Sequence, residues 1–294
     1  MMSSRKKDAR SEEKTGRVSI RDDERVEPSS GHVARSKRAN AEGGDAAKRL
    51  TALEEAQQLM YKAWQTTDPL TRVALAQKAL ELSSDCADAY VLLGREISTS
   101  IADAIALYRL GVEAGERAIG KEAFERDAGR FWEIVETRPY MRARQGLAEF
   151  LWGAGHREEA VEHYQDLLRL NPTDNQGIRN LLMPCLIELG RDEDAYALFK
   201  RYELDEMAVW KYSRVVLEFR KNGDSPSAGE FLEKALEQNP FVPEYLLGRK
   251  AMPHNLPQHF SFGDRNEAIM YVYDNHVVWN KTPGILNWLK ARME

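Results

Sequence analysis

Apolar residues recur every three or four positions through most of the chain from Asp45 onward, the spacing that places them on one face of an α-helix. Residues 146–172 and 215–240 show this pattern most clearly, and each stretch ends at an Asn-Pro pair. The apolar positions near the two ends are Ala160, Val161, Tyr164, Leu167 and Leu168 in one stretch and Ala228, Phe231, Leu232, Ala235 and Leu236 in the other. The pattern predicts an all-α protein built from amphipathic helices.

The amphipathic helices repeat with a nearly constant period. Ala160, Ala195 and Ala228 are separated by 35 and 33 positions, and each is followed four positions later by an aromatic residue or leucine. A period close to 34 residues with this spacing resembles the tetratricopeptide repeat, in which two antiparallel helices form one unit and successive units stack. The resemblance implies an α-solenoid of helical hairpins, in which the small residues mark close helix crossings.

The match to the repeat pattern varies along the chain, and this variation divides the chain into segments. Residues 1–44 hold few apolar side chains, so this segment is predicted to be a disordered polar tail. Trp279 and Trp288, near the end of the chain, are expected to cover the apolar face of the last full repeat. Within the predicted solenoid of residues 45–294 we expect a degenerate cap at 45–84, repeats at 85–117, an insertion at 118–138, repeats at 139–240 and a capping module at 241–294.

The C-terminal segments resemble a narrower family than the repeat itself. The stretches ALEQNPFVPEYLLGRK and GDRNEAIMYVYDNHVVWNKTPGILNWL do not occur at the end of ordinary tetratricopeptide arrays. Together with the order of the preceding segments from about residue 69, they resemble the suppressor of tumorigenicity 7 family. The resemblance implies a helical-repeat protein without a known catalytic constellation. Animal members of that family are membrane-associated through hydrophobic N-terminal spans, whereas the N-terminal segment here is polar, so we expect no membrane residence.

Composition and charge bear on the cellular compartment of the protein and on the partners it can bind. No run of 18 apolar residues occurs in the 294-residue chain, so a transmembrane helix is not expected. Cys86 and Cys185 have no CxxC spacing and are predicted to be buried core thiols, which suits the cytoplasm. Basic stretches in the tail alternate with acidic ones, and the net charge of the chain is −5. Binding of nucleic acid is therefore not expected.

Histidines provide the one candidate for catalytic or metal chemistry. His254 and His259 are predicted to lie in a Pro-rich loop and His276 on a helix, with no cysteine nearby and no HExxH motif in the chain. A hydrolase that uses this C-terminal histidine-rich loop is the alternative hypothesis. We predict that the chain is not an enzyme and needs no cofactor or metal.

The remaining function is recognition of a partner. In solenoids of this kind the first helices of successive repeats line a concave groove, and their non-core positions face the ligand. The predicted groove residues are Arg142, Gln145, Glu149, Trp152, Asn180, Glu188, Trp210 and Arg214. The sequence therefore predicts a protein-interaction module or scaffold for an unknown protein or peptide. It leaves open whether the groove or the convex face is used, whether Arg138, Arg142 and Arg144 recognise an anion, and whether the chain forms homo-oligomers.

Overall fold

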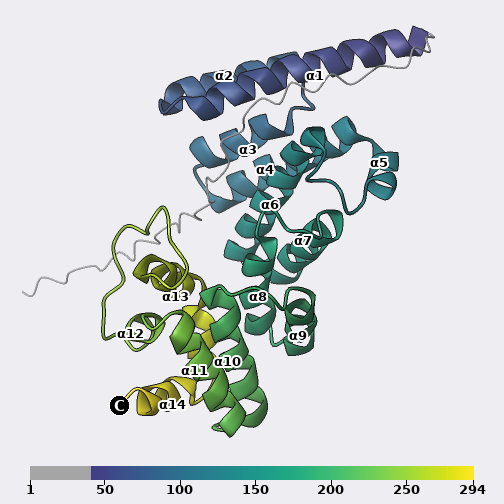
Figure 1. Ribbon diagram of the computed structural model, residues 1–294. Helices are drawn as coiled ribbons and strands as arrows, with labels where there is room; N and C mark the ends of the chain where they lie inside the picture. The colour runs from purple at the N-terminus through teal and green to yellow at the C-terminus, as the bar shows by residue number, and fades with distance from the viewer. Residues whose placement is uncertain (1–40) are drawn as a thin grey trace, which may run out of the picture. The chain divides into compact units, whose positions relative to one another are not determined.

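The computed structural model describes the chain from Ala41 to Glu294, with side chains from Ala47 onward (Figure 1). The described residues form helices, turns and loops and contain no β-strand, so the all-α prediction is confirmed. Most of the predicted disordered tail, residues 1–40, lies outside the described residues. Its last residues, 41–44, belong to the first helix instead, because α1 begins at Ala41.

The described helices fall into two compact units. Of the described residues, unit 1 holds 41–121 and 136–156, and unit 2 holds 122–135 and 157–294. The helices of unit 1 are α1 (Ala41–Gln65), α2 (Pro69–Leu82), α3 (Ala87–Glu96), α4 (Ile101–Ile119) and α6 (Arg138–Gly153). Those of unit 2 are α7 (Arg157–Leu170), α8 (Ile178–Glu188), α9 (Asp192–Arg201), α10 (Ala208–Asn222), α11 (Pro226–Gln238), α12 (Val242–Leu246), α13 (Arg265–Asn280) and α14 (Ile285–Arg292). The short α5 (Lys121–Arg126) and a 3₁₀ turn, η1 (Val135–Thr137), lie at the boundaries between these segments.

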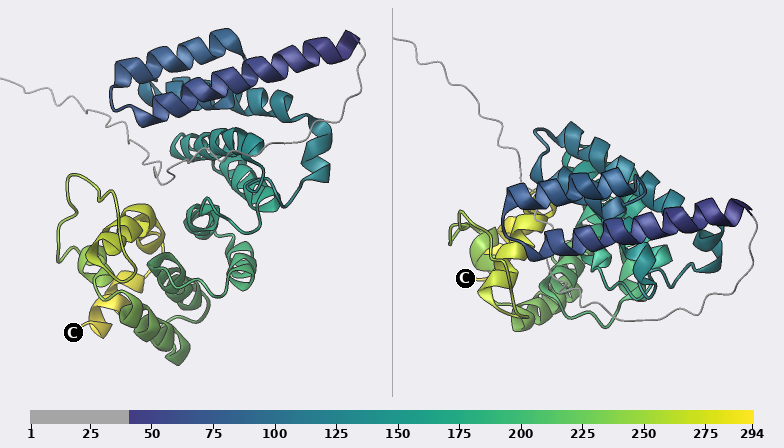
Figure 2. Two further views of the ribbon diagram at one scale, coloured as in Figure 1. Left: turned by 45° about the horizontal axis from the view of Figure 1, so that its top comes forward. Right: turned by 90° about the horizontal axis from the view of Figure 1, so that it is seen from above.

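Unit 1 consists of antiparallel helical hairpins. Helix α1 packs against α2, α3 against α4, and α4 against α6, as the views in Figure 2 show for the first pair. Asp68 and Ser100 cap α2 and α4, because each side chain accepts a hydrogen bond from a backbone N–H of the first turn. Small fully buried residues line the α1–α2 crossing, among them Ala56, Ala63 and Ala79. These are the close helix contacts that the tetratricopeptide pattern implies.

A buried ring joins three helices of unit 1. Tyr108 on α4 is fully buried and lies between Gly94 on α3 and Gly146 on α6. A β-carbon on Gly146 would lie 2.1 Å from the Cε1 atom of Tyr108, and one on Gly94 would lie 2.9 Å from its Cε2 atom. The two glycines therefore provide the space in which the tyrosine ring packs.

Unit 2 contains hairpins of the same kind, with α8 packed on α7 and α9, and α10 packed on α11. Ser225 caps α11 and Asp264 caps α13 through side-chain hydrogen bonds to the first turn. Between α4 and α6, in the predicted insertion, Phe131 is buried, and its N–H donates to the carbonyl of Leu170 at 3.1 Å.

Helix α13, which precedes the C-terminal helix α14, does not pack as the second helix of a hairpin would. It packs against α12 and also against both α8 and α10, the first helices of two hairpins. Trp279 lies with its ring centroid 6.4 Å from that of Tyr212 on α10, and Trp288 on α14 lies 5.0 Å from Phe219 of the same helix. Both tryptophans thus contact α10, the first helix of the last full hairpin.

Candidate interaction surfaces

The predicted groove residues of unit 1 lie on α6, where Arg142 forms an ion pair with Asp88 of α3. The guanidinium Nε and Nη2 atoms donate to the two carboxylate oxygens at 2.8 and 2.7 Å. Gln57 of α1 donates to the same carboxylate at 2.7 Å. Asp88 is fully buried, and three hydrogen bonds satisfy its carboxylate where water does not reach. Arg142 therefore ties α6 to α3 and is already engaged within the unit.

The other predicted residues of α6 form a row beside this pair. Gln145 donates to Glu149 at 3.0 Å, and Glu149 is 7% exposed, whereas Trp152 is half-buried. Arg144 donates to the hydroxyl of Tyr140, its neighbour on the same helix. The guanidinium groups of Arg142 and Arg144 thus have separate partners, which argues against one shared anion site for these two arginines.

In unit 2, Trp210 and Asn180 are core residues. The indole Nε1 of Trp210 donates to Oδ1 of Asn180 at 2.7 Å, and Trp210 is 2% exposed. The Trp210 ring lies edge-on to Phe199 and Tyr202 of the preceding hairpin, with centroid distances of 5.0 and 6.2 Å. The prediction that Trp210 and Asn180 face an open groove is wrong, because hydrophobic burial and this hydrogen bond turn both side chains into the interior.

Glu188 at the end of α8 is also engaged within unit 2. Its carboxylate accepts hydrogen bonds from Arg157 at the start of α7 and from Lys281 just after α13, the second at 2.9 Å. The side chain of Glu188 is 8% exposed. The prediction of an open groove position is wrong here too, since two cations from neighbouring segments cover the carboxylate.

Helix α13 covers the face that α8 and α10 share. Glu267 of α13 is 2% exposed and accepts a hydrogen bond from the backbone N–H of Ala208 at 2.9 Å. The same carboxylate accepts from Gln238 at 3.1 Å and Asn239 at 2.9 Å. Tyr212 of α10 stacks at 5.4 Å from Tyr271 of α13. Buried polar contacts and aromatic packing therefore hold α13 on the first helices of unit 2.

Arg214 is the predicted groove residue that differs from the rest. Its guanidinium carbon lies 4.7 Å from the ring centroid of Phe231 on α11, and 5.0 and 5.8 Å from those of Tyr196 and Phe199 on α9. Arg214 is half-buried, and within the described part of the chain it forms neither a hydrogen bond nor an ion pair. Cation–π contacts with these rings hold its guanidinium, while its N–H donors stay available.

Two lysines extend the cationic group around Arg214. Lys221 lies with Nζ 5.9 Å from the ring centroid of Tyr196, and Lys234 lies 5.5 Å from that of Phe231. Both are exposed, and neither is ion-paired with any residue that the structure describes. We call the six residues that make up this surface the Arg214 patch: Tyr196, Phe199, Arg214, Lys221, Phe231 and Lys234.

Glu218 is an acidic residue that borders the Arg214 patch. Glu218, one turn after Arg214, accepts hydrogen bonds from Ser227 at 2.5 Å and Asn222 at 2.6 Å. The bond from Ser227 is the main cause that holds the pKa of Glu218 below its usual value, and the charge of Arg214 acts in the same direction. Glu218 is thus anchored by neutral donors, and no hydrogen bond joins it to Arg214.

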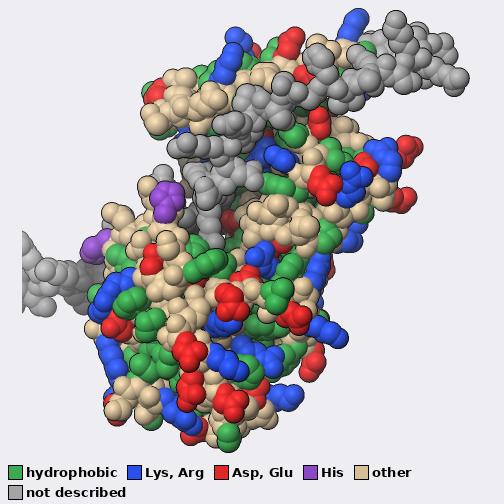
Figure 3. Space-filling model, in the orientation of Figure 1, with side chains coloured by type: hydrophobic (Ala, Val, Ile, Leu, Met, Phe, Trp, Pro, Cys, Tyr) green, Lys and Arg blue, Asp and Glu red, His purple; other side chains and the backbone are tan. Residues whose placement is uncertain are grey.

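Sequence reasoning found Arg214 but missed its neighbours. Tyr196, Phe231 and Lys234 lie on the second helices α9 and α11, whereas the predicted groove is lined by first helices alone. Lys221 lies on α10 but near its end, two turns after Arg214. On the face drawn in Figure 3, basic and acidic side chains are interspersed. A count of charges along the sequence therefore does not reveal where cations lack acidic neighbours.

The histidines do not converge on a site. His254 and His259 are exposed in the loop between α12 and α13, and His276 is exposed on α13, with Nδ1 3.1 Å from the carbonyl oxygen of Tyr273. Over residues 41–294, no group of three His, Cys, Asp or Glu side chains is arranged to hold a metal ion. The hydrolase hypothesis finds no acid or metal partner for these rings in the described part of the chain.

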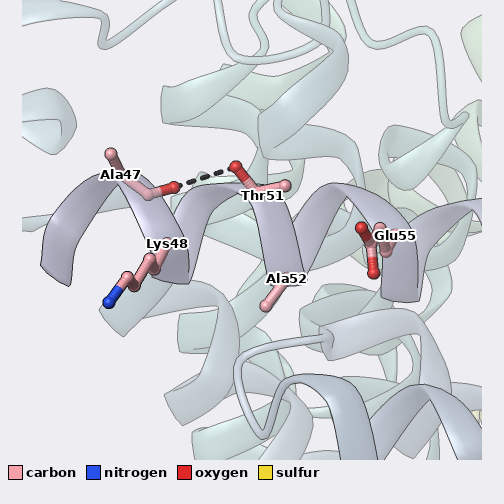
Figure 4. A pocket seen from close by; sticks show the side chains of 5 residues that line it. All are labelled: Ala47, Lys48, Thr51, Ala52 and Glu55. Carbon is pink, nitrogen blue, oxygen red and sulfur yellow. Dashed lines mark hydrogen bonds between the residues drawn. The ribbon is translucent and has the colours of Figure 1, made fainter. Parts of the chain in front are cut away.

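A shallow hollow on α1 also offers little chemistry. It is lined by Ala47, Lys48, Thr51, Ala52 and Glu55, as Figure 4 shows. The Thr51 hydroxyl donates to the carbonyl of Ala47 at 3.0 Å within the helix. All these lining residues come from one helix, and within the described part of the chain no second element brings a functional group toward them.

The hairpins, the close small-residue crossings and the surfaces described above define a helical-repeat protein of the tetratricopeptide kind. The sequence model of the family described as ST7 protein matches residues 49–294. The chain therefore belongs to the ST7 protein family, as the C-terminal segments indicated. None of the helices described for this chain is both long and apolar enough to cross a membrane.

Several known proteins are similar to this chain. It is 31% identical over 258 residues to the suppressor of tumorigenicity 7 protein-like of Rattus norvegicus. This alignment covers 80% of this chain and 46% of the relative. It is 27% identical over 266 residues to the protein ST7 homolog of Drosophila pseudoobscura pseudoobscura, with 83% and 49% covered. The chain thus spans about half the length of these relatives. Among solved structures it is similar to YrrB, a TPR protein with an unusual peptide-binding site, with a TM-score of 0.46, 20% identity, and 67% of this chain and 89% of that chain covered.

Proposed function

We propose that this chain is a protein-interaction module that holds a peptide or protein partner on the surfaces of its helical hairpins. The observation that carries the proposal is the seat of α13 on α8 and α10. That face holds a helical segment from a distant part of the chain through Glu267 and stacked aromatic rings. Laying a helix into a groove of other helices is a common mode of peptide recognition, and here the seated helix belongs to the chain itself.

In unit 1 the surface proposed for a partner is the row on α6, where Gln145 and Trp152 lie on either side of the buried Glu149 at spacings of three or four residues. In unit 2 the proposed surface includes Arg214, on the side of α10 away from α13. The proposal places the module in the cytoplasm, assigns it no catalytic step and no cofactor, and leaves homo-oligomerisation open.

A site-specific cross-linking experiment tests the proposal. A photoreactive amino acid is placed at Gln145 in the row on α6 or, as a control, at Glu81, which is exposed on α2. The full chain is expressed in cells, irradiated and purified, and cross-linked proteins are identified by mass spectrometry. We expect a reproducible partner from position 145 and none from position 81. Equal recovery at both positions, or no cross-linked protein at either, contradicts the proposal.

A further inference from the structure

The Arg214 patch lies on the side of α10 that faces away from α13. Successive helical residues are about 100° apart around the axis, so Arg214 projects nearly opposite to Tyr212, two positions earlier. Tyr212 faces α13, where it stacks on Tyr271 and Trp279. The rings around Arg214 come instead from α9 and α11. The patch is therefore separate from the face on which α13 is seated.

Arg214 forms no ion pair with a described residue, whereas most other arginines of unit 2 do. Arg157, Arg179, Arg191, Arg220 and Arg292 each form an ion pair with an acidic side chain. Arg201 donates to the carbonyl of Leu168 at 2.8 Å. Two acids near this surface are already engaged. Asp192 forms an ion pair with Arg220, and Glu218 accepts hydrogen bonds from Ser227 and Asn222. Within the described residues, no carboxylate forms an ion pair with Arg214, Lys221 or Lys234, although the charges of Arg214 and Lys221 act on the nearby Glu218.

The geometry of the guanidinium determines which ligand it can accept. The guanidinium carbon lies close to the Phe231 and Tyr196 rings, and none of the guanidinium N–H groups is used in a hydrogen bond with a described residue. None of the Arg214 nitrogen atoms is a buried polar atom without a partner, so solvent reaches the N–H edge of the group. An edge of parallel N–H donors matches the two oxygens of a carboxylate, and such charge-assisted bidentate contacts are among the stronger hydrogen bonds.

We propose that the Arg214 patch binds an acidic linear segment of a partner protein. One Asp or Glu carboxylate of the segment pairs edge-on with the Arg214 guanidinium, and further carboxylates lie near Lys221 and Lys234. The half-buried rings of Tyr196 and Phe231 hold the arginine in place and contact the aliphatic parts of the segment. This assignment rests on the proposed function, because it specifies the partner of an interaction module.

Peptide binding to the purified full chain tests the assignment. The probe is a fluorescein-labelled peptide of about ten residues that alternates Glu with Gly and Leu, and the control probe has Gln in place of every Glu. Fluorescence anisotropy is measured for the wild-type chain, for Arg214→Gln and for Arg214→Lys. The matched control is Arg169→Gln, which removes one positive charge from an exposed arginine of α7 in the same unit.

The assignment predicts a specific order of affinities. The wild-type chain binds the Glu peptide and not the Gln peptide, and its binding weakens as salt screens the charges. Arg214→Gln weakens binding at least fivefold, Arg214→Lys weakens it less, and Arg169→Gln stays within about twofold of the wild type. Circular dichroism of each variant confirms that it is folded. Equal affinity for both peptides, no binding by the wild type, or equal loss in Arg214→Gln and Arg169→Gln overturns the assignment.

The cross-linking experiment at Gln145 separates this inference from the proposed function. If partners cross-link at position 145 equally well in the wild-type and Arg214→Gln chains, and the peptide result is negative, the acidic-segment assignment fails while the interaction module stands. If no partner cross-links in the wild-type chain, the proposed function fails, whatever the peptide affinities are.

Discussion

The ring of Tyr108 between two glycines makes a sharp test of the helix crossings in unit 1. Replacing Gly146 by Ala places a methyl group 2.1 Å from the Cε1 atom of Tyr108 and 2.7 Å from its Cδ1 atom, far inside van der Waals contact. The ring cannot retreat, because it is fully buried and already approaches the position of a Gly94 β-carbon to 2.9 Å on its other side. We therefore expect Gly146→Ala to force α6 away from α4.

The magnitude follows from two opposing terms. Glycine in a helix interior is less favourable than alanine by about 1 kcal/mol, so the substitution gains that amount from helix propensity. Overpacking a closed core costs about 1–3 kcal/mol, and the upper end applies because the ring is enclosed on both sides. Gly146→Ala should therefore lower the free energy of unfolding by about 2 kcal/mol, the difference between the upper cost and the gain.

Urea denaturation followed by circular dichroism measures this change, with Gly153→Ala as the matched control. Gly153 is the last residue of α6, and an added methyl group there meets no atom within 4 Å. The control should be neutral or slightly stabilising. In the Gly146→Ala background, Tyr108→Leu should recover about 1 kcal/mol or more relative to the sum of the two single changes, because it removes the clashing ring atoms. If Gly146→Ala is as stable as Gly153→Ala, the crossing described here is wrong.

Three further predictions concern buried groups. Ala160→Leu on α7, where the alanine is fully buried, should destabilise by about 1–3 kcal/mol in urea denaturation, and an unchanged midpoint would refute the close crossing assigned to that residue. Burial raises the pKa of Cys86 to about 12 and that of Cys185 well above its ordinary value, and thiolate forms only as pH rises through the pKa. Both thiols should therefore resist a thiol reagent at about pH 8 until the chain is unfolded, and rapid labelling of the folded chain would contradict their burial. Glu267→Gln should lower the free energy of unfolding by about 2–3 kcal/mol, because the new NH₂ group would face N–H donors in a buried site. A stability equal to that of the wild type would show that these donors do not depend on the carboxylate.

Several features of this protein follow from the sequence alone. The alanines at 160, 195 and 228 are all fully buried, as small residues at close crossings should be. Asp264 precedes α13 and caps it, because its side chain accepts a hydrogen bond from the backbone N–H of Glu267 in the first turn. These features are local: apolar spacing and capping residues act within one helix or one hairpin, so the order of residues determines them directly.

The tertiary structure decided which surfaces stay open. The sequence shows that α10 has both apolar and polar faces, but it does not show that Trp210 turns toward α9 and is buried. It also does not show that α13 is seated on α8 and α10, since that contact joins segments about 60 residues apart through Glu267 and the N–H of Ala208. Helical periodicity indicates which face of a helix seeks burial, whereas the partner that covers the face depends on how the hairpins stack. For the same reason, only the folded chain shows that Arg214 lies among rings and forms no ion pair with a described residue, while most other arginines of unit 2 are paired with acids.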